Sequence, residues 1–134
     1  MKSRDSLLRL KRFHVDEKRR RVAQIELMMS EFERSISDLD EQIRVEQEKS
    51  GIDDPTHYAY PTFAKAARQR RENLEVSIDD LRSQLDNARA DLGEAFEELK
   101  KFELLEERSE RQARADLNKV EQDAMDEAAS RIAS

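Results

Sequence analysis

The sequence predicts an all-α protein built as a long antiparallel two-helix coiled-coil hairpin. Three observations predict it: few turn residues, two heptad-spaced runs of apolar residues, and a single proline-containing segment between those runs. Of the 134 residues, 42% are charged, 37% are hydrophobic and 5% are aromatic, and only 2 are Gly and 2 are Pro. This composition argues against a thick globular core and favours long helices or disorder, so the spacing of the apolar residues decides between them.

The first expected helix covers residues of about 3–50. Its apolar residues recur at alternating steps of three and four, which is the spacing of a coiled-coil seam. They are Val22, Ile25, Met29, Phe32, Ile36, Leu39 and Ile43.

The expected loop covers residues of about 51–61 and holds both prolines. Gly51 suits the left-handed residue that follows a helix end. The pair Asp54-Pro55 is typical of a helix cap followed by a first-turn proline, and Pro61 can open the next helix. The chain is therefore expected to reverse here.

The second expected helix covers residues of about 62–116 and keeps the same heptad phase over four heptads. Its seam residues are Leu74, Ile78, Leu81, Leu85, Ala88, Leu92, Ala95, Leu99 and Phe102. Residues 1–134 are expected to form a single coiled-coil domain, in which residues 117–134 overhang as a lone helix or fray.

Two registers satisfy the paired seams, because neither narrow stripe is stable until it packs against the other. Paired residue numbers sum either to 110, which sets Phe32 against Ile78, or to 117, which sets Phe32 against Leu85. The loop length favours the first register and the core chemistry slightly favours the second. In both, pairing within one chain predicts a monomer.

Charge distinguishes the amino-terminal segment from the rest of the chain. Residues 1–21 carry nine Lys or Arg against three Asp or Glu, a balance of +6, while the whole chain has a net charge of -6. Residues 103–134 are acidic, with nine Asp or Glu against five Lys or Arg. Charged residues such as Lys11 and Glu106 occupy seam positions, so this end of the hairpin is expected to be looser than its middle.

No catalytic, cofactor-binding or metal site is expected, and we expect no enzyme activity. A two-helix coiled coil has no enclosed pocket, and the sequence has no Cys and only 2 His, which lie in different segments. Pairs of acidic residues are typical of a solvated helix face in so charged a chain. No apolar run reaches the length of a signal peptide or of a membrane span, which favours a soluble, cytoplasmic protein.

Basic and aromatic clusters supply the candidates for binding protein partners. Aromatic residues near an exposed loop are typical of docking sites, although they can instead pack on one another to close the turn. A basic run before heptads also resembles a nucleic-acid-binding zipper, but Leu8 and Val15 continue the seam through it, so no nucleic acid partner is expected. The candidates are Arg12, Arg19, Arg20, Arg21, Tyr58, Tyr60, Phe63, Arg70 and Arg71.

Several segments resemble the FliJ family of flagellar export proteins in its alphaproteobacterial form. The first are Met1-Lys2-Ser3-Arg4-Asp5-Ser6-Leu7, Arg9-Leu10-Lys11-Arg12-Phe13, Val15-Asp16-Glu17-Lys18-Arg19-Arg20 and Val22-Ala23-Gln24-Ile25-Glu26. The later ones are Ala59-Tyr60-Pro61, Ala66-Ala67-Arg68-Gln69-Arg70-Arg71, Asn73-Leu74 and Glu94-Ala95-Phe96-Glu97-Glu98-Leu99-Lys100-Lys101. The resemblance covers residues 1 to about 105.

This resemblance implies a non-enzymatic component of the flagellar type III export apparatus, similar to the central stalk of rotary ATPases. It implies three partners: the hexameric export ATPase, the cytoplasmic domain of the export gate, and export chaperones. The protein would then lie in the cytoplasm at the base of the export apparatus and reach the membrane only through partners. By analogy with a rotary stalk, the end with the termini would enter the ATPase ring and the loop would face the gate. The alternative is an unrelated structural or chaperone-like coiled coil, and less favoured still is a basic coiled coil that binds nucleic acid.

Overall fold

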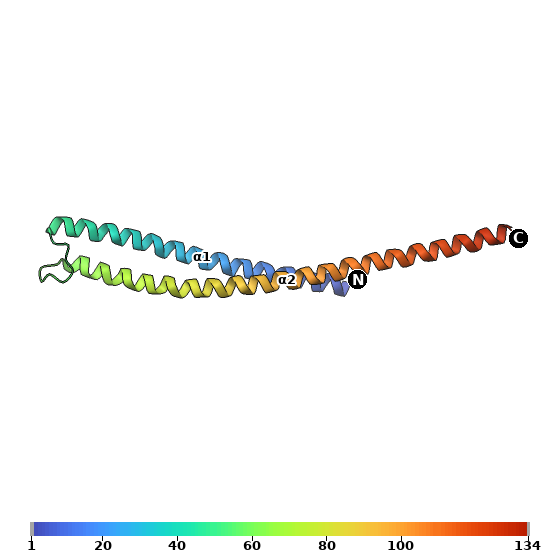
Figure 1. Cartoon of the computed structure of the whole chain (residues 1–134), viewed down its shortest axis with the longest axis horizontal. Helices are drawn as coiled ribbons and strands as arrows, with labels where there is room; N and C mark the ends of the chain where they lie inside the picture. Colours follow the sequence, from blue (N-terminus) through green and yellow to red (C-terminus); the bar gives the residue numbers. More distant parts are fainter. Residues whose placement is uncertain (1, 134) are drawn as a thin grey trace. The chain divides into compact units, whose positions relative to one another are not determined.

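The computed structural model describes residues 2–133, which form two helices and one loop and contain no strand (Figure 1). Helix α1 spans Lys2–Ser50 and has 49 residues. Helix α2 spans Thr62–Ala133 and has 72 residues. The prediction of an all-α, two-helix hairpin is confirmed. Neither helix, over the part of the chain described, contains a stretch apolar and long enough to span a bilayer.

Contacts divide the chain into two compact units. The loop unit is Asp16–Leu92 and contains the turn between the helices. The terminal unit consists of the residues up to Val15 together with those from Gly93 onward. In each unit a segment of α1 packs against a segment of α2, and each unit has a seam of its own.

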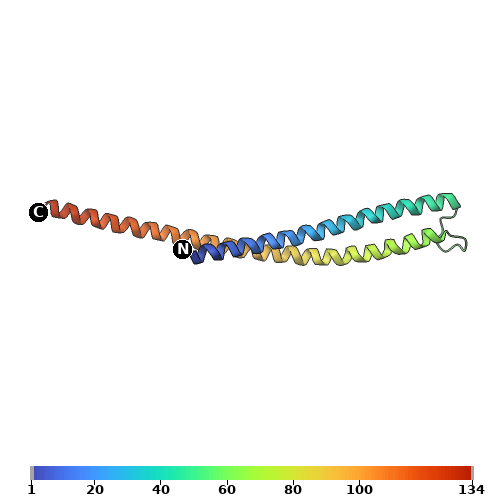
Figure 2. The same cartoon turned by 180° about the vertical axis from the view of Figure 1, so that it is seen from behind.

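The loop unit holds most of the apolar core. Ile25 is 1% exposed and packs in a cluster with Leu81, Leu85 and Ala88. Nearer the loop, Leu39 and Ile43 cluster with Ala67. Figures 1 and 2 show from opposite sides that these segments of α1 and α2 lie side by side. Large α1 side chains therefore share each cluster with an alanine of α2, which lets the two helices approach closely.

The terminal unit has a seam in which charged side chains lie between apolar ones. Leu8, Val15 and Leu99 are buried. Lys11 lies at the same seam, where its Nζ is 2.7 Å from Glu98 Oε1 and 5.1 Å from the centroid of the Phe102 ring. The hydrogen bond from Lys11, followed by its charge, lowers the pKa of Glu98 below its usual value. An ammonium group is thus accommodated in the seam by one carboxylate and one aromatic ring.

Cross-helix ion pairs fix the register separately in each unit. In the terminal unit, Arg4 pairs with Glu106 and Lys11 with Glu98. In the loop unit, Asp40 pairs with Arg71 and Glu26 with Arg89. The residue numbers of these four pairs sum to 110, 109, 111 and 115. The core pairs Ile25 with Leu85 and Ile43 with Ala67 each sum to 110, so the structure has the 110 register and the 117 alternative is wrong. Loop length was the better guide, because a slip of one heptad would move every pair by about 10 Å.

The loop begins and ends as the sequence predicts, but the helix cap predicted at Asp54 is absent. Gly51 has a φ of 71° and donates its N–H to the Gln47 carbonyl at 2.9 Å, so it is the left-handed residue that ends α1. The Pro61 carbonyl accepts the Lys65 N–H at 3.0 Å, which begins α2. Asp54 does not cap a helix: its Oδ1 accepts the Thr56 N–H at 2.9 Å within a turn.

A pair of engineered cysteines should test both the register and the intramolecular pairing, because the chain has no native Cys. Ile25→Cys/Leu85→Cys should form a disulfide within one chain under mild oxidation, since the two residues share a core cluster. Ile25→Cys/Leu92→Cys, which the 117 register would pair, should stay reduced. Mobility on non-reducing gels separates intrachain from interchain products, and a product that is only interchain would contradict the monomeric hairpin.

Candidate partner-binding surfaces

The four basic candidates of α1 are exposed to solvent in different surroundings. Arg12 lines a shallow groove of the terminal unit opposite Glu103, Glu107 and Glu110 of α2. Arg19, Arg20 and Arg21 lie in the loop unit, where Arg21 Nη2 donates to Gln84 Oε1 at 3.3 Å. The charge of Arg12 is therefore partly offset by acidic neighbours, whereas the run 19–21 has three exposed arginines, which point in directions 100° apart around the helix.

The two basic candidates of α2 differ from each other. Arg71 donates from Nε to Asp40 Oδ1 and from Nη1 to Glu75 Oε1. The hydrogen bond to Asp40 is the main cause of a raised pKa for the Arg71 guanidinium. Arg70 is exposed and borders a shallow depression with Ser35 and Asp38. Arg71 thus connects the two helices, and Arg70 alone of this pair presents its charge to solvent.

The three aromatic candidates lie in two kinds of environment. Tyr58 is 96% exposed and stacks on His57 with ring centroids 4.7 Å apart, and Phe63 is 55% exposed. Tyr60 is only 8% exposed, and its hydroxyl accepts a hydrogen bond from Gln47 Nε2 at 2.9 Å. The expectation of an exposed aromatic is therefore wrong for Tyr60, which packs at the base of the loop and holds it against α1.

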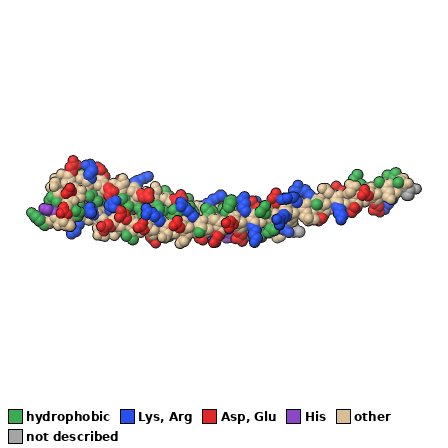
Figure 3. Space-filling model, in the orientation of Figure 1, with side chains coloured by type: hydrophobic (Ala, Val, Ile, Leu, Met, Phe, Trp, Pro, Cys, Tyr) green, Lys and Arg blue, Asp and Glu red, His purple; other side chains and the backbone are tan. Residues whose placement is uncertain are grey.

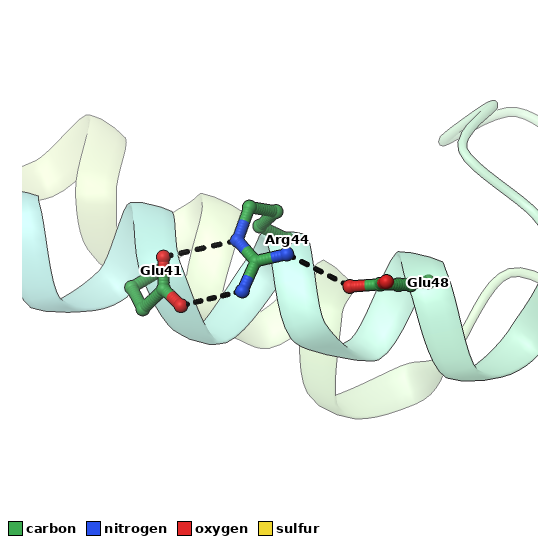
Figure 4. Close-up of polar contacts among 3 residues, drawn as sticks. All are labelled: Glu41, Arg44 and Glu48. Atoms are coloured by element: carbon green, nitrogen blue, oxygen red, sulfur yellow. Dashed lines mark hydrogen bonds and ion pairs between the residues drawn. The ribbon is translucent and has the colours of Figure 1, made fainter.

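Sequence reasoning missed a charge cluster near the end of α1. Arg44 donates from Nε and Nη2 to the carboxylate of Glu41 and from Nη1 to Glu48 Oε2 at 2.7 Å (Figure 4). The hydrogen bonds from Arg44 lower the pKa of Glu41. The spacing of three and four residues was the available signal. Because all three residues lie on one exposed helix face, the cluster supports the helix locally and leaves little unpaired charge.

The described surface carries both acidic and basic side chains. Figure 3 shows acidic and basic side chains interspersed over the face in view. No group of three or more His, Asp or Glu suited to a metal ion occurs within residues 2–133. The described surface presents exposed arginines and exposed aromatic rings, those of Phe13, Tyr58, Phe63 and Phe96.

Comparisons with known proteins identify the family of the chain. A family model described as "Flagellar FliJ protein" matches residues 1–134. Two relatives called "Flagellar FliJ protein", from Caulobacter vibrioides strains NA1000 / CB15N and ATCC 19089 / CIP 103742 / CB 15, are each 28% identical over 129 residues. The match covers 96% of this chain and 93% of each relative. No solved structure matches. The chain therefore belongs to the FliJ family of flagellar export proteins.

Proposed function

We propose that the protein is a non-enzymatic, stalk-like coiled coil that links the export ATPase ring to the export gate and assists the cycling of export chaperones. It would act in the cytoplasm at the base of the flagellar export apparatus. The observation that carries this proposal is the family match over the full chain on two long helices that pack antiparallel. Such a scaffold has surfaces suited to docking other proteins along its helices.

The proposal assigns the ATPase to the basic part of α1 and the export gate to the loop. The run 19–21 supplies exposed positive charge, which attracts an acidic protein surface and orients it during encounter. Tyr58 and Phe63 supply exposed rings, which are the side chains that most often anchor protein interfaces. The different chemistry of these two surfaces is the reason to assign them to different partners.

Charge reversal should test the contact with the ATPase. Arg19→Glu/Arg20→Glu/Arg21→Glu should weaken binding to the purified hexameric ATPase by about tenfold, and the remaining binding should depend less on salt. Helix content should be unchanged, because the three side chains lie outside the seam. Surface plasmon resonance at two salt concentrations measures both effects.

The matched control is Arg34→Glu/Arg68→Glu/Arg82→Glu, which changes the net charge equally at other exposed positions of the loop unit. Its ATPase binding should remain near that of the parent. Equal losses in both triple variants would show that net charge, and not the run 19–21, determines the affinity.

Removal of the exposed rings should test the contact with the gate. Tyr58→Ala/Phe63→Ala should weaken binding to the cytoplasmic gate domain by about 2–4 kcal/mol, because each aromatic anchor contributes about 1–2 kcal/mol. Isothermal titration calorimetry measures the loss. Leu27→Ala/Val76→Ala, which truncates two other exposed apolar side chains, is the control. If the ring variant lost ATPase binding and kept gate binding, the assignment of the two surfaces would be reversed.

A further inference from the structure

The face of α2 that packs on α1 in the terminal unit continues beyond the region that α1 covers. Leu99, Phe102 and Glu106 lie on this face. At 100° per residue, the same face is continued by Glu110, then by five apolar positions, and then by Arg131. The apolar positions are Ala113, Leu117, Val120, Ala124 and Ala128. All five are exposed, with Leu117 at 57% and Val120 at 64%, so a surface continuous with an established interface lies open to solvent.

The established part of this interface indicates the charge of its partner helix. Where α1 packs on α2 in the terminal unit, the basic side chains of Arg4 and Lys11 come from α1, and the acidic side chains of Glu106 and Glu98 come from α2. The extension keeps the acidic character: residues 110–133 carry six Asp or Glu and four Lys or Arg, a balance of -2. Three of the acidic residues follow one edge of the apolar face. They are Asp116, Asp123 and Glu127.

The sizes of the apolar residues indicate what must pack against them. Three of the five positions on the open face are alanine. In the loop unit, alanines of α2 share their core clusters with large α1 residues, as Ala88 does with Ile25 and Ala67 with Ile43. A face rich in alanine therefore accepts a helix that carries large apolar side chains.

We propose that residues 110–133 form a docking surface for a basic amphipathic helix of a partner protein. The large apolar residues of that helix would pack over Ala113, Ala124 and Ala128 and between Leu117 and Val120. Its Lys and Arg side chains would pair with the acidic edge. This inference goes beyond the proposed function, which assigns no contact to this segment.

A second copy of the same segment is a poor occupant of this face. Antiparallel pairing of two copies places the same edge of each helix side by side, so Asp116, Asp123 and Glu127 would face acidic residues of the other copy. Like charges at these flanking positions oppose association. The edge thus favours a basic partner and disfavours self-association.

A synthetic peptide that copies residues 2–21 is a suitable probe, because it is basic and carries the seam residues Leu8 and Val15. Labelled peptide should bind the full-length protein in fluorescence anisotropy. Hydrogen exchange should slow over residues 110–133, since an uncovered helix exchanges quickly. Protection confined to residues 93–109 would mean that the peptide only displaces α1, and it would overturn the proposal, as would a lack of binding.

Variants on the docking face and matched variants elsewhere on the helix test whether binding depends on the face or only on the added charge. Leu117→Asp/Val120→Asp should weaken peptide binding by about tenfold or more, whereas Ala115→Asp/Ala129→Asp, on the far side of the helix, should bind like the parent. Asp123→Lys should also weaken it, whereas Asp126→Lys, which makes the same change in net charge on the far side of the helix, should not. Circular dichroism checks that helix content is retained.

Two further outcomes would overturn the proposal. One is equal binding by the face variant and its control, which would show that residues 117 and 120 do not form the contact. The other is a dimer of the parent chain in sedimentation equilibrium that Leu117→Asp/Val120→Asp dissociates, which would make a second copy the occupant. A monomeric parent that binds the peptide through this face supports the assignment.

Discussion

Replacing Ile25 by aspartate should largely unfold the loop unit. Ile25 is 1% exposed and lies in the cluster with Leu81, Leu85 and Ala88. A carboxylate at this position must either lose its hydration or break the packing around it, at a cost of about 4 kcal/mol or more. Since small domains have about 5–15 kcal/mol of stability in total, the melting temperature should fall steeply. Circular dichroism at 222 nm, recorded against temperature and urea, measures the change.

The matched control for this substitution is Leu27→Asp, two positions away on the same helix. Leu27 is 61% exposed, so its aspartate remains hydrated and should cost no more than about 0.5–1 kcal/mol. Similar melting of the two variants would show that residue 25 is not a seam position and that the heptad assignment is in error.

Replacing Tyr60 by alanine should loosen the loop and the first turn of α2. Tyr60 is buried and its hydroxyl is hydrogen-bonded to Gln47, so removal of the ring leaves a cavity and removes the shorter of the two hydrogen bonds that Gln47 Nε2 donates, with an expected loss of about 2–4 kcal/mol. Tyr60→Phe keeps the ring and should lose only about 1 kcal/mol. Urea unfolding measures the stability of each variant, and hydrogen exchange locates the change.

Tyr58→Ala is the control for Tyr60→Ala, because it removes an identical side chain two positions away that is exposed to solvent. Its stability should match that of the parent within about 0.5 kcal/mol. If Tyr58→Ala proved as destabilising as Tyr60→Ala, the rings of residues 57–60 would stabilise the loop as a stacked group, and Tyr58 would be unsuited to the role of a free docking ring.

The helices and their pairing could be predicted from the sequence because most seam positions hold an apolar side chain that must be buried against the other helix. Ile25, Leu81 and Leu85 are buried where the heptad spacing places them. The turn could be predicted because few residues adopt a positive φ as readily as Gly51. The register could not be decided from the seam alone, because a slip of one heptad keeps apolar residues paired with apolar residues along most of its length.

The candidate surfaces were less predictable, because the same residue type serves both solvent-facing and packing roles. The aromatic character that made Tyr58 and Tyr60 candidates is the same for both, and the direction of the chain through the loop exposes one and buries the other. Arg70 and Arg71 are neighbours, yet a rotation of 100° per residue brings only Arg71 within reach of Asp40. Such assignments depend on helix rotation and loop path, which a linear pattern of charges does not specify.

The antiparallel seam also limits how the length of this protein can change in evolution. An insertion of one, two, five or six residues in α1 between Ile25 and Ile43 would rotate one of these side chains out of its cluster by 100° or more. Insertions of three, four or seven residues keep both side chains near the seam, the first two at the cost of local overwinding or unwinding. Each would need a matching insertion in α2 to restore the pairing. Related chains should therefore differ in their paired segments by three, four or seven residues, added to both helices together. Additions in the part of α2 that α1 does not cover are free of this rule.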